Sequence, residues 1–221
     1  MFCKNLIVGS GPAGIAVSYS LLEQTESVTL VEAALDSSNS HPNSFQGFSD
    51  KLSLTAGLSR SRSRSLGGTS NLWGGGCCEL DEEDFYMRSW IPNSGWPFKK
   101  AELLAHYDTI YNLLGLSPQT NRNPAAIGHS ELPGLELVVL QYTPHKLLKD
   151  YISKFQSSYS ANFSLLKGFT LVDISLSDDQ KRVVGANFIN HRKKYISIEC
   201  ENLVLCLGCI ESTRILLNSF D

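Results

Sequence analysis

The sequence predicts an α/β fold in which parallel strands alternate with helices, and three observations predict it. A short apolar run meets glycines at the spacing GxGxxG over residues 9–14, and a helical pattern follows at once. A second apolar run, residues 28–31, ends about 20 residues further on in an acidic residue, Glu32. A continuous apolar run at residues 203–207 is typical of a strand buried on both faces, and a glycine and a helix follow it too. Together these features indicate a Rossmann-like dinucleotide-binding core.

The residues of the fingerprint suit close contact with a dinucleotide. Gly9 permits the tight turn out of the first strand, Gly11 lets the backbone approach a pyrophosphate, and Gly14 lets the next helix pack closely on the strand. Pro12 suits the first helical turn, where its missing N–H leaves no bond unmade. The helix N-terminus offers free N–H groups and a partial positive charge to the phosphates. We therefore expect a dinucleotide at this turn.

The next helix and strand complete a βαβ unit. Apolar residues at helical spacing predict a helix over residues 12–23, and a second parallel strand follows at residues 28–32. Glu32 stands at the end of that strand, where a carboxylate can accept hydrogen bonds from both hydroxyls of an adenosine ribose. The same carboxylate would repel a 2′-phosphate, so the sequence disfavours NADP as the ligand.

A long polar stretch without periodicity runs from residue 33 to residue 66. It ends in alternating serine and arginine at residues 59–65. Such a run could bind RNA, could lie as a positive loop near a cofactor pyrophosphate, or could be a solvated loop. A formal net charge of −3 disfavours RNA binding. The sequence leaves the other two interpretations open.

A glycine-rich stretch follows at residues 66–76, with two hydroxyls, an amide and Trp73 among its glycines. Backbone of this kind can run close to a flat or phosphorylated ligand and donate N–H groups to it. The alternative is a flexible linker, but linkers rarely carry a large aromatic residue. We interpret the stretch as part of the ligand site.

The middle of the chain predicts two further helices. One spans residues 100–114, with an apolar stripe, and Gly115 and Pro118 end it. The other is expected to be capped by Thr143 and Pro144.

Short extended runs with turn residues between them come next. They predict a small antiparallel β-meander, built from residues 164–167, 170–176, 183–189 and 194–200. Residues 203–207 then return to the parallel sheet, and a helix follows at residues 211–218. The core is therefore predicted from residues 1–35 and 160–221, with residues 36–159 inserted between them.

Composition narrows the functional classes. The chain has 221 residues, of which 42% are hydrophobic, so a substantial core is possible. The net charge gives no general attraction for nucleic acid or an anionic membrane. No apolar run approaches the roughly 20 residues that a spanning helix needs. The first residues are interpreted as a strand and not as a signal peptide, which favours a cytoplasmic location.

The six cysteines do not form the framework of a secreted disulfide protein. Cys206 and Cys209 stand in a CxxC pattern, and Cys77 and Cys78 are adjacent. Redox chemistry is one interpretation of both pairs. The favoured interpretation of the CxxC is small residues packed under a cofactor, because Cys206 ends an apolar strand. No metal site is predicted, since a second ligand pair is missing.

Four motifs in order give the chain its resemblance to a known family. They are GSGPAG with Glu32, LGGTSNLWGGG, the helix AELLAHYDTIY after a Trp-Pro, and VLCLGCIESTRILLNS. The chain resembles the glucose–methanol–choline (GMC) oxidoreductases, flavoenzymes that oxidise alcohols and sugars. The helix motif and the form of LGGTSNLWGGG are most similar to those of the sugar-oxidising branch. The resemblance implies FAD as the cofactor and a role for residues 36–159 in covering the flavin.

The resemblance also assigns residues to parts of FAD. One group would hold the pyrophosphate, and Glu32 the adenosine ribose. A second group would lie along the pyrophosphate and the flavin ring. Leu171 would contact adenine through its backbone, and Cys206 and Gly208 would stand beside the adenosine half. The first group is Gly9, Gly11, Pro12, Ala13 and Gly14; the second is Gly67, Gly68, Thr69, Ser70, Asn71, Trp73 and Gly74.

The sequence departs from the family pattern in two places. Some sugar oxidases attach FAD covalently through a His just before the Trp, where this chain has Leu72. We therefore expect non-covalent FAD. The family's catalytic His lies in a C-terminal substrate domain, which these residues lack, and none of the five histidines matches its motif. No catalytic residue is assigned, and this chain alone is expected to be inactive, with a second polypeptide as one source of the missing part.

Three hypotheses follow. The leading one is the FAD-binding part of an enzyme that oxidises a CH–OH group of a sugar or alcohol, with hydride transfer to flavin. The second is a degenerate flavin-fold fragment without catalysis. The third is an NAD-binding enzyme of another family, which has no need of the glycine-rich stretch at residues 66–76.

Overall fold

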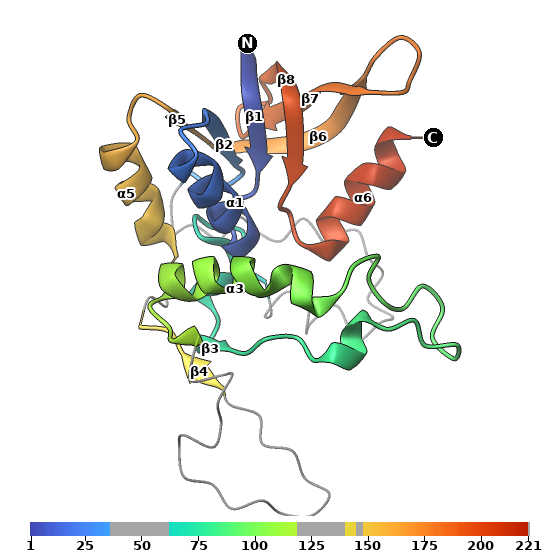
Figure 1. The fold of residues 1–221 in the computed structure, drawn as a ribbon. Helices are drawn as coiled ribbons and strands as arrows, with labels where there is room; N and C mark the ends of the chain where they lie inside the picture. Colours follow the sequence, from blue (N-terminus) through green and yellow to red (C-terminus); the bar gives the residue numbers. More distant parts are fainter. Residues whose placement is uncertain (36–61, 119–139, 145–147, 221) are drawn as a thin grey trace, which may run out of the picture. The chain divides into compact units, whose positions relative to one another are not determined.

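The structure is a computed structural model that describes residues 1–35, 62–118, 140–144 and 148–220 (Figure 1). Its contacts divide the chain into two units. The sheet unit comprises Met1–Trp73 and Leu147–Asp221, and the small unit comprises Gly74–Lys146.

The sheet unit is built on one six-stranded mixed sheet in the order β5-β2-β1-β8-β7-β6. The pairs β5–β2, β2–β1 and β1–β8 are parallel, and the pairs β8–β7 and β7–β6 are antiparallel. Strands β1 and β8 run alongside each other in Figure 1. The predicted α/β fold, a parallel sheet with helices and additional antiparallel strands, is confirmed. The strands are β1 (Phe2–Val8), β2 (Val28–Glu32), β5 (Phe163–Lys167), β6 (Phe169–Leu176), β7 (Val183–Asn190) and β8 (Tyr195–Leu205).

The predicted antiparallel meander is confirmed for β6, β7 and β8, but two of its details are wrong. Strand β5 does not join it, because it pairs in parallel with β2, from Val28 opposite Phe163 onward. Strand β8 also continues without a break from the meander into the parallel sheet. The polar pair Glu201 and Asn202 interrupts the apolar pattern but not the strand, because the Asn202 amide donates to Asn5 Oδ1 at 3.0 Å.

Three helices pack on this sheet: α1 (Pro12–Glu23), α5 (Lys149–Ser158) and α6 (Cys209–Ser219). Helix α1 has the predicted bounds and contacts β1, β2 and α5, whereas α6 packs on β6. The proposed cap of α5 is wrong. The helix follows buried Leu148, and the Thr143 hydroxyl instead donates to the Leu114 carbonyl at 2.5 Å within the small unit.

The two faces of strand β1 have different partners. Leu6 and Val8 belong to an apolar cluster with residues of β6, β7, β8 and α6. Ile7 alternates with them and therefore points to the opposite face, where fully buried Ile15 and Leu22 belong to helix α1. Burial on both faces explains why the first strand reads as a continuous apolar run.

The small unit holds the predicted helix over residues 100–114, here α3 (Lys100–Leu114). The Glu102 carboxylate accepts the Lys99 N–H at 2.8 Å at its start, and Gly115, at φ 66°, ends it. The other elements are β3 (Gly76–Cys77), β4 (Gln141–Tyr142), which pairs with β3, and the 3-10 helices η2 (Glu82–Phe85) here and η1 (Gly68–Asn71) in the sheet unit.

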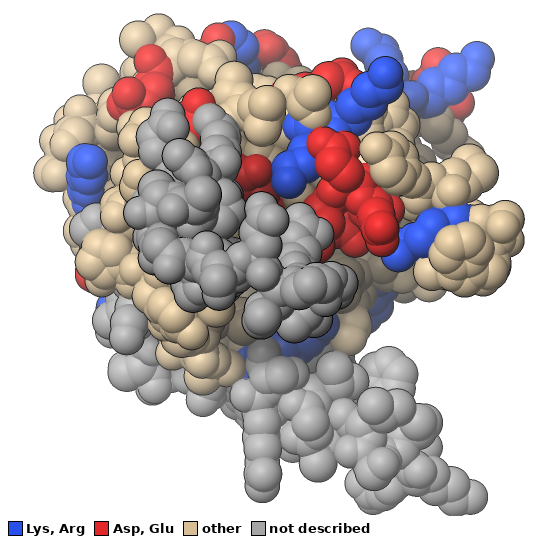
Figure 2. Space-filling view, turned by 60° about the horizontal axis from the view of Figure 1, so that its bottom comes forward, with Lys and Arg blue, Asp and Glu red and all other residues tan. Residues whose placement is uncertain are grey.

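The helices and the surface charges bear on possible membrane contact. No helix within the described ranges combines the length and the apolar character needed to cross a membrane. Acidic and basic side chains both occur on the face drawn in Figure 2. This mixture agrees with the small net charge of −3.

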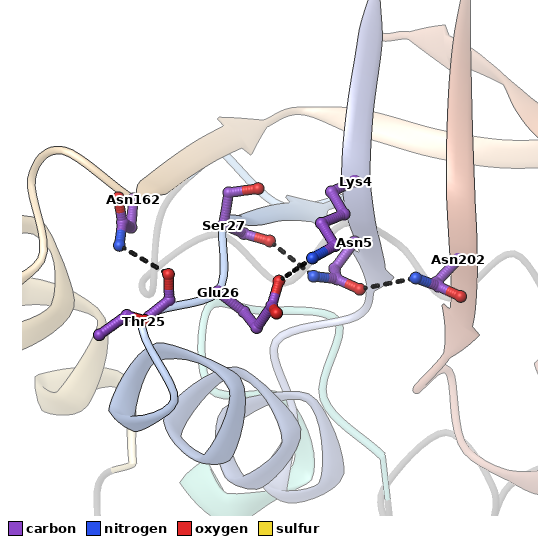
Figure 3. Close-up of polar contacts among 7 residues, drawn as sticks. All are labelled: Lys4, Asn5, Thr25, Glu26, Ser27, Asn162 and Asn202. Atoms are coloured by element: carbon purple, nitrogen blue, oxygen red, sulfur yellow. Dashed lines mark hydrogen bonds and ion pairs between the residues drawn. The ribbon is translucent and has the colours of Figure 1, made fainter.

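A set of polar contacts, the amino-end network, links β1 and β8 to the segments that precede β2 and β5 (Figure 3). Asn5, in β1, donates to the Ser27 carbonyl at 2.9 Å and accepts from Asn202 of β8 at 3.0 Å. Asn162 donates to the Thr25 carbonyl at 3.1 Å. The buried Asn5 amide therefore bonds to backbone before β2 and to the neighbouring strand β8, which fixes their relative register.

Candidate functional site

A cavity of about 400 Å³ lies at the carboxyl-terminal ends of β1, β2 and β8. Every residue that lines it belongs to the sheet unit. Ligands of open α/β sheets bind outside the carboxyl ends of the strands, where neighbouring strands connect in opposite directions. Strand β1 lies between β2 and β8, which makes this position such a point.

Most of the residues assigned to the cofactor from the sequence line this cavity. Gly14, Gly67, Ser70, Asn71 and Trp73 belong to the same unit but do not line it, and Gly74 lies in the small unit. The structure therefore brings together the fingerprint, the acidic residue, the start of η1 and the end of β8. The assigned residues in the wall are Gly9, Gly11, Pro12, Ala13, Glu32, Gly68, Thr69, Leu171, Cys206 and Gly208.

Glu32 is buried at the end of β2, with 7% of its surface exposed. Its Oε2 accepts two hydrogen bonds from Ser10, from the N–H at 3.0 Å and from the hydroxyl at 2.5 Å. Its Oε1 accepts one, from the Ala34 N–H at 3.0 Å. A carboxylate offers about four acceptor positions. Oε1 therefore keeps the capacity to accept a ligand hydroxyl.

Gly11 and Gly14 of the fingerprint differ in what requires a glycine at each position. A Cβ on Gly14 would stand 1.9 Å from the Gly9 carbonyl oxygen, so the protein's own packing forbids one. A Cβ on Gly11 would meet no atom within 4 Å. Gly11 lines the cavity and has a φ of −69°, which any residue adopts. Neither packing nor backbone conformation requires glycine there, whereas a ligand lying against the backbone would.

The glycine-rich loop, Gly67–Asn71, is held by its own side chains. Asn71 Nδ2 lies 2.7 Å from the Ser65 hydroxyl and 2.9 and 3.0 Å from the carbonyls of Leu66 and Gly68, so its two N–H groups are shared among three acceptors. The Ser70 hydroxyl donates to the Gly67 carbonyl at 2.7 Å. The side chains of Ser70 and Asn71 thus hold the loop through internal hydrogen bonds and do not line the cavity, whereas Gly68 and Thr69 line it.

Several wall residues escaped the sequence assignment. Arg64 lines the cavity and donates to the Thr170 hydroxyl at 3.2 Å. Ser63, Arg64 and Ser65 of the Arg-Ser run line the cavity, whereas residues 59–61 lie outside the described residues. On α6, Glu211 and Arg214 also line the cavity and pair at 3.0 Å.

Ser10 is a further wall residue that the sequence assignment missed. It is fully buried and occupies a variable position of the GxGxxG pattern. No motif flags it, because its importance depends on Glu32 and Gly67, which are distant in the sequence.

Cys206 lines the cavity directly after the end of β8. Burial raises its pKa to about 11, so the thiol stays protonated at neutral pH and is a poor nucleophile. Cys206 and Cys209 are both free cysteines. These properties agree with the interpretation that Cys206 is a small residue under a cofactor. No histidine is among the described residues that line the cavity.

Comparison with known proteins gives a clear structural likeness and no sequence match. No family model matches the chain, and no curated protein does either. Pyridoxine 4-oxidase from Mesorbium loti superposes with a TM-score of 0.64 at 19% identity, over 98% of this chain and 52% of that one. A formate oxidase from Aspergillus oryzae, solved in a study of FAD modification, gives 0.61 at 14% identity, over 99% and 47%. THI4 from Thermovibrio ammonificans gives 0.52 at 14% identity, over 99% and 63%.

At these identities the likeness establishes the fold. The chain spans about half the length of the two oxidases.

Proposed function

We propose that this chain is the FAD-binding part of a GMC-type oxidoreductase that oxidises a CH–OH group of a sugar or an alcohol. Bound FAD would supply the hydride acceptor. The chain's own residues would bind and orient the cofactor, and the proton-accepting base would come from outside the described residues.

The observation that carries the proposal is the open space over Gly11. A Cβ there meets nothing within 4 Å, although the residue lines a cavity at the carboxyl ends of parallel strands. A pyrophosphate resting on this backbone explains the missing side chain. The N-terminus of α1, directly behind it, stabilises negative charge through its free N–H groups.

Other wall residues fit the adenosine half. Glu32 Oε1 retains acceptor capacity for a ribose hydroxyl, and Leu171 on β6 offers its backbone to adenine. Cys206 and Gly208, at the end of β8, would bound the same half of the cofactor. Cys206 itself adds no charge to that wall, because its thiol stays protonated.

The flavin half of the cofactor would lie along the glycine-rich loop with Trp73 and Gly74. We propose that residues 36–159 cover it, around a core of residues 1–35 and 160–221. The FAD named for the formate oxidase supports flavin over NAD. The form of LGGTSNLWGGG favours the sugar-oxidising branch, and Leu72 favours non-covalent attachment. A further polypeptide segment, on this chain or a second one, would supply the catalytic His and the substrate domain.

The test is a titration of the purified chain with FAD, followed by flavin fluorescence. A Kd of about 1 μM or tighter supports the proposal. Binding of NAD in preference to FAD supports an NAD enzyme, and binding of neither supports a degenerate fold. Flavin that stays with acid-precipitated protein would contradict non-covalent attachment.

A pair of variants separates ligand contact from packing. Gly11→Ala should weaken FAD binding about a hundredfold, because its methyl group enters the cavity and not the core. Its stability should fall by no more than about 1 kcal/mol, since Gly11 is the N-cap of α1 and Ala is a poorer cap than Gly. Gly14→Ala is the contrast: its Cβ would stand 1.9 Å from a carbonyl oxygen, so stability should fall by about 3 kcal/mol. A Gly11→Ala variant that binds FAD normally would remove the main support for the site.

A further inference from the structure

The Ser10 hydroxyl joins two segments of the cavity wall that are far apart in the sequence. It donates to Glu32 Oε2 at 2.5 Å and accepts the Gly67 N–H at 3.0 Å. The side chain is fully buried. One hydroxyl thus bonds both to the ribose-binding carboxylate and to the first residue of the glycine-rich loop.

These two bonds differ in how easily they can be replaced. Glu32 is also held by the N–H groups of Ser10 and Ala34, each at 3.0 Å, which need no Ser10 side chain. For the Gly67 N–H, the acceptor in the described part of the chain is the Ser10 hydroxyl. Loss of that hydroxyl should therefore disturb the loop more than the carboxylate.

Bonds within the glycine-rich loop hold its shape, so the bond between Gly67 and Ser10 acts on the position of the loop against the fingerprint. Asn71 and Ser70 hold the loop internally. The loop also lies very close to the fingerprint, since a Cβ on Gly68 would stand 2.8 Å from Gly11 Cα. A buried N–H without an acceptor is costly, and the loop could satisfy it only by shifting towards water. Such a shift would move Gly68 and Thr69 away from Gly11.

We propose that Ser10 is a positioning residue that docks the glycine-rich loop onto the fingerprint and so favours ligands that reach both segments. The inference rests on the proposed FAD site. FAD needs the docked loop, whereas AMP, which ends at the first phosphate, depends mainly on Glu32 and the helix N-terminus. A protein whose loop is undocked has to return the loop to its docked position when FAD binds, and this cost lowers the apparent affinity for FAD.

The experiment compares Ser10→Ala with Ser18→Ala and measures Kd for FAD and AMP by calorimetry. Ser18 is the matched control: it is also fully buried in the sheet unit, but its hydroxyl has no hydrogen-bond partner among the described residues. Ser10→Ala should weaken FAD roughly tenfold and AMP by no more than about twofold. Ser18→Ala should leave both unchanged. Hydrogen exchange at the Gly67 amide should become faster only in Ser10→Ala.

The outcomes are distinguishable. Equal losses for FAD and AMP, or unchanged exchange at Gly67, would overturn the role of Ser10 while leaving the FAD site intact. A wild-type chain that binds neither ligand would overturn the proposed function and this inference with it. If Ser10→Ala does not fold, Ser10→Cys replaces it, because its thiol is a weaker hydrogen-bonding group than the hydroxyl. Ser10→Cys should lose less FAD affinity than Ser10→Ala, and a loss that is larger for FAD than for AMP supports the docking role of Ser10.

Discussion

The two ends of the parallel strands use buried polar side chains in different ways. At the amino-terminal ends, the Asn5 amide donates to the Ser27 carbonyl and accepts from Asn202 (Figure 3). At the carboxyl-terminal ends, Ser10 and Glu32 form a comparable set of bonds, but both residues line the cavity. The first set connects protein groups to one another, whereas the second leaves Glu32 Oε1 able to accept another bond.

A buried polar network is therefore not by itself a binding site. Both networks satisfy their groups within the protein, as buried polar groups require. The difference is that the cavity lies beside Ser10 and Glu32, which form the network at the carboxyl-terminal ends. Changes at that end should therefore alter ligand affinity, and changes at the amino end should alter stability alone.

The largest effect is expected at the carboxyl end. Glu32→Gln replaces a negatively charged acceptor with an amide, whose NH₂ group would face donors from Ser10 or Ala34. FAD should bind about a hundredfold more weakly, because hydrogen bonds to charged groups contribute about 1.5–3 kcal/mol. The same fluorescence titration measures it. Wild-type affinity in this variant would mean that the ribose is held elsewhere.

The next effect is expected at the amino end. Asn5→Ala leaves the Ser27 carbonyl and the Asn202 amide without their partner, so the free energy of unfolding should fall by about 2 kcal/mol. Urea denaturation measures this change, and FAD affinity should stay within about twofold of wild type. A large loss of affinity would show that the two ends are coupled.

A double-mutant cycle sharpens the same point. Asn202→Ala alone should cost about 1 kcal/mol, and the double variant Asn5→Ala/Asn202→Ala should cost less than the sum of the two. Strict additivity would mean that the amide pair contributes nothing to the pairing of β1 with β8.

The smallest effect is expected at the exposed ion pair of the amino end. Lys4 Nζ and Glu26 Oε2 are 2.6 Å apart on the surface. Lys4→Ala should leave both the melting temperature at neutral pH and the FAD affinity unchanged, because exposed ion pairs contribute little. The hydrogen bond to Glu26 raises the pKa of Lys4, so whatever the pair contributes is present at neutral pH and is lost as the pH rises above 10.5. A fall in melting temperature at neutral pH in Lys4→Ala would contradict this expectation.

The local elements of this protein could be predicted from the sequence. The glycine spacing and the apolar periodicity located the first strand, helix α1 with its bounds at residues 12 and 23, and Glu32 at the end of β2. Helix α3 followed in the same way from its apolar stripe and Gly115. Each of these signals lies within a few residues, where backbone geometry alone links pattern to structure.

The pairing of segments that are distant in the sequence became visible in the fold. The fold assigned β5 to the edge beside β2, and it kept β8 continuous through Asn202 because Asn5 supplies a partner. It also placed the Gly67 amide on Ser10, 57 residues away. An apolar period says which face of a strand is buried but not which strand lies beside it, and a buried serine gains its role from neighbours that the local sequence does not contain.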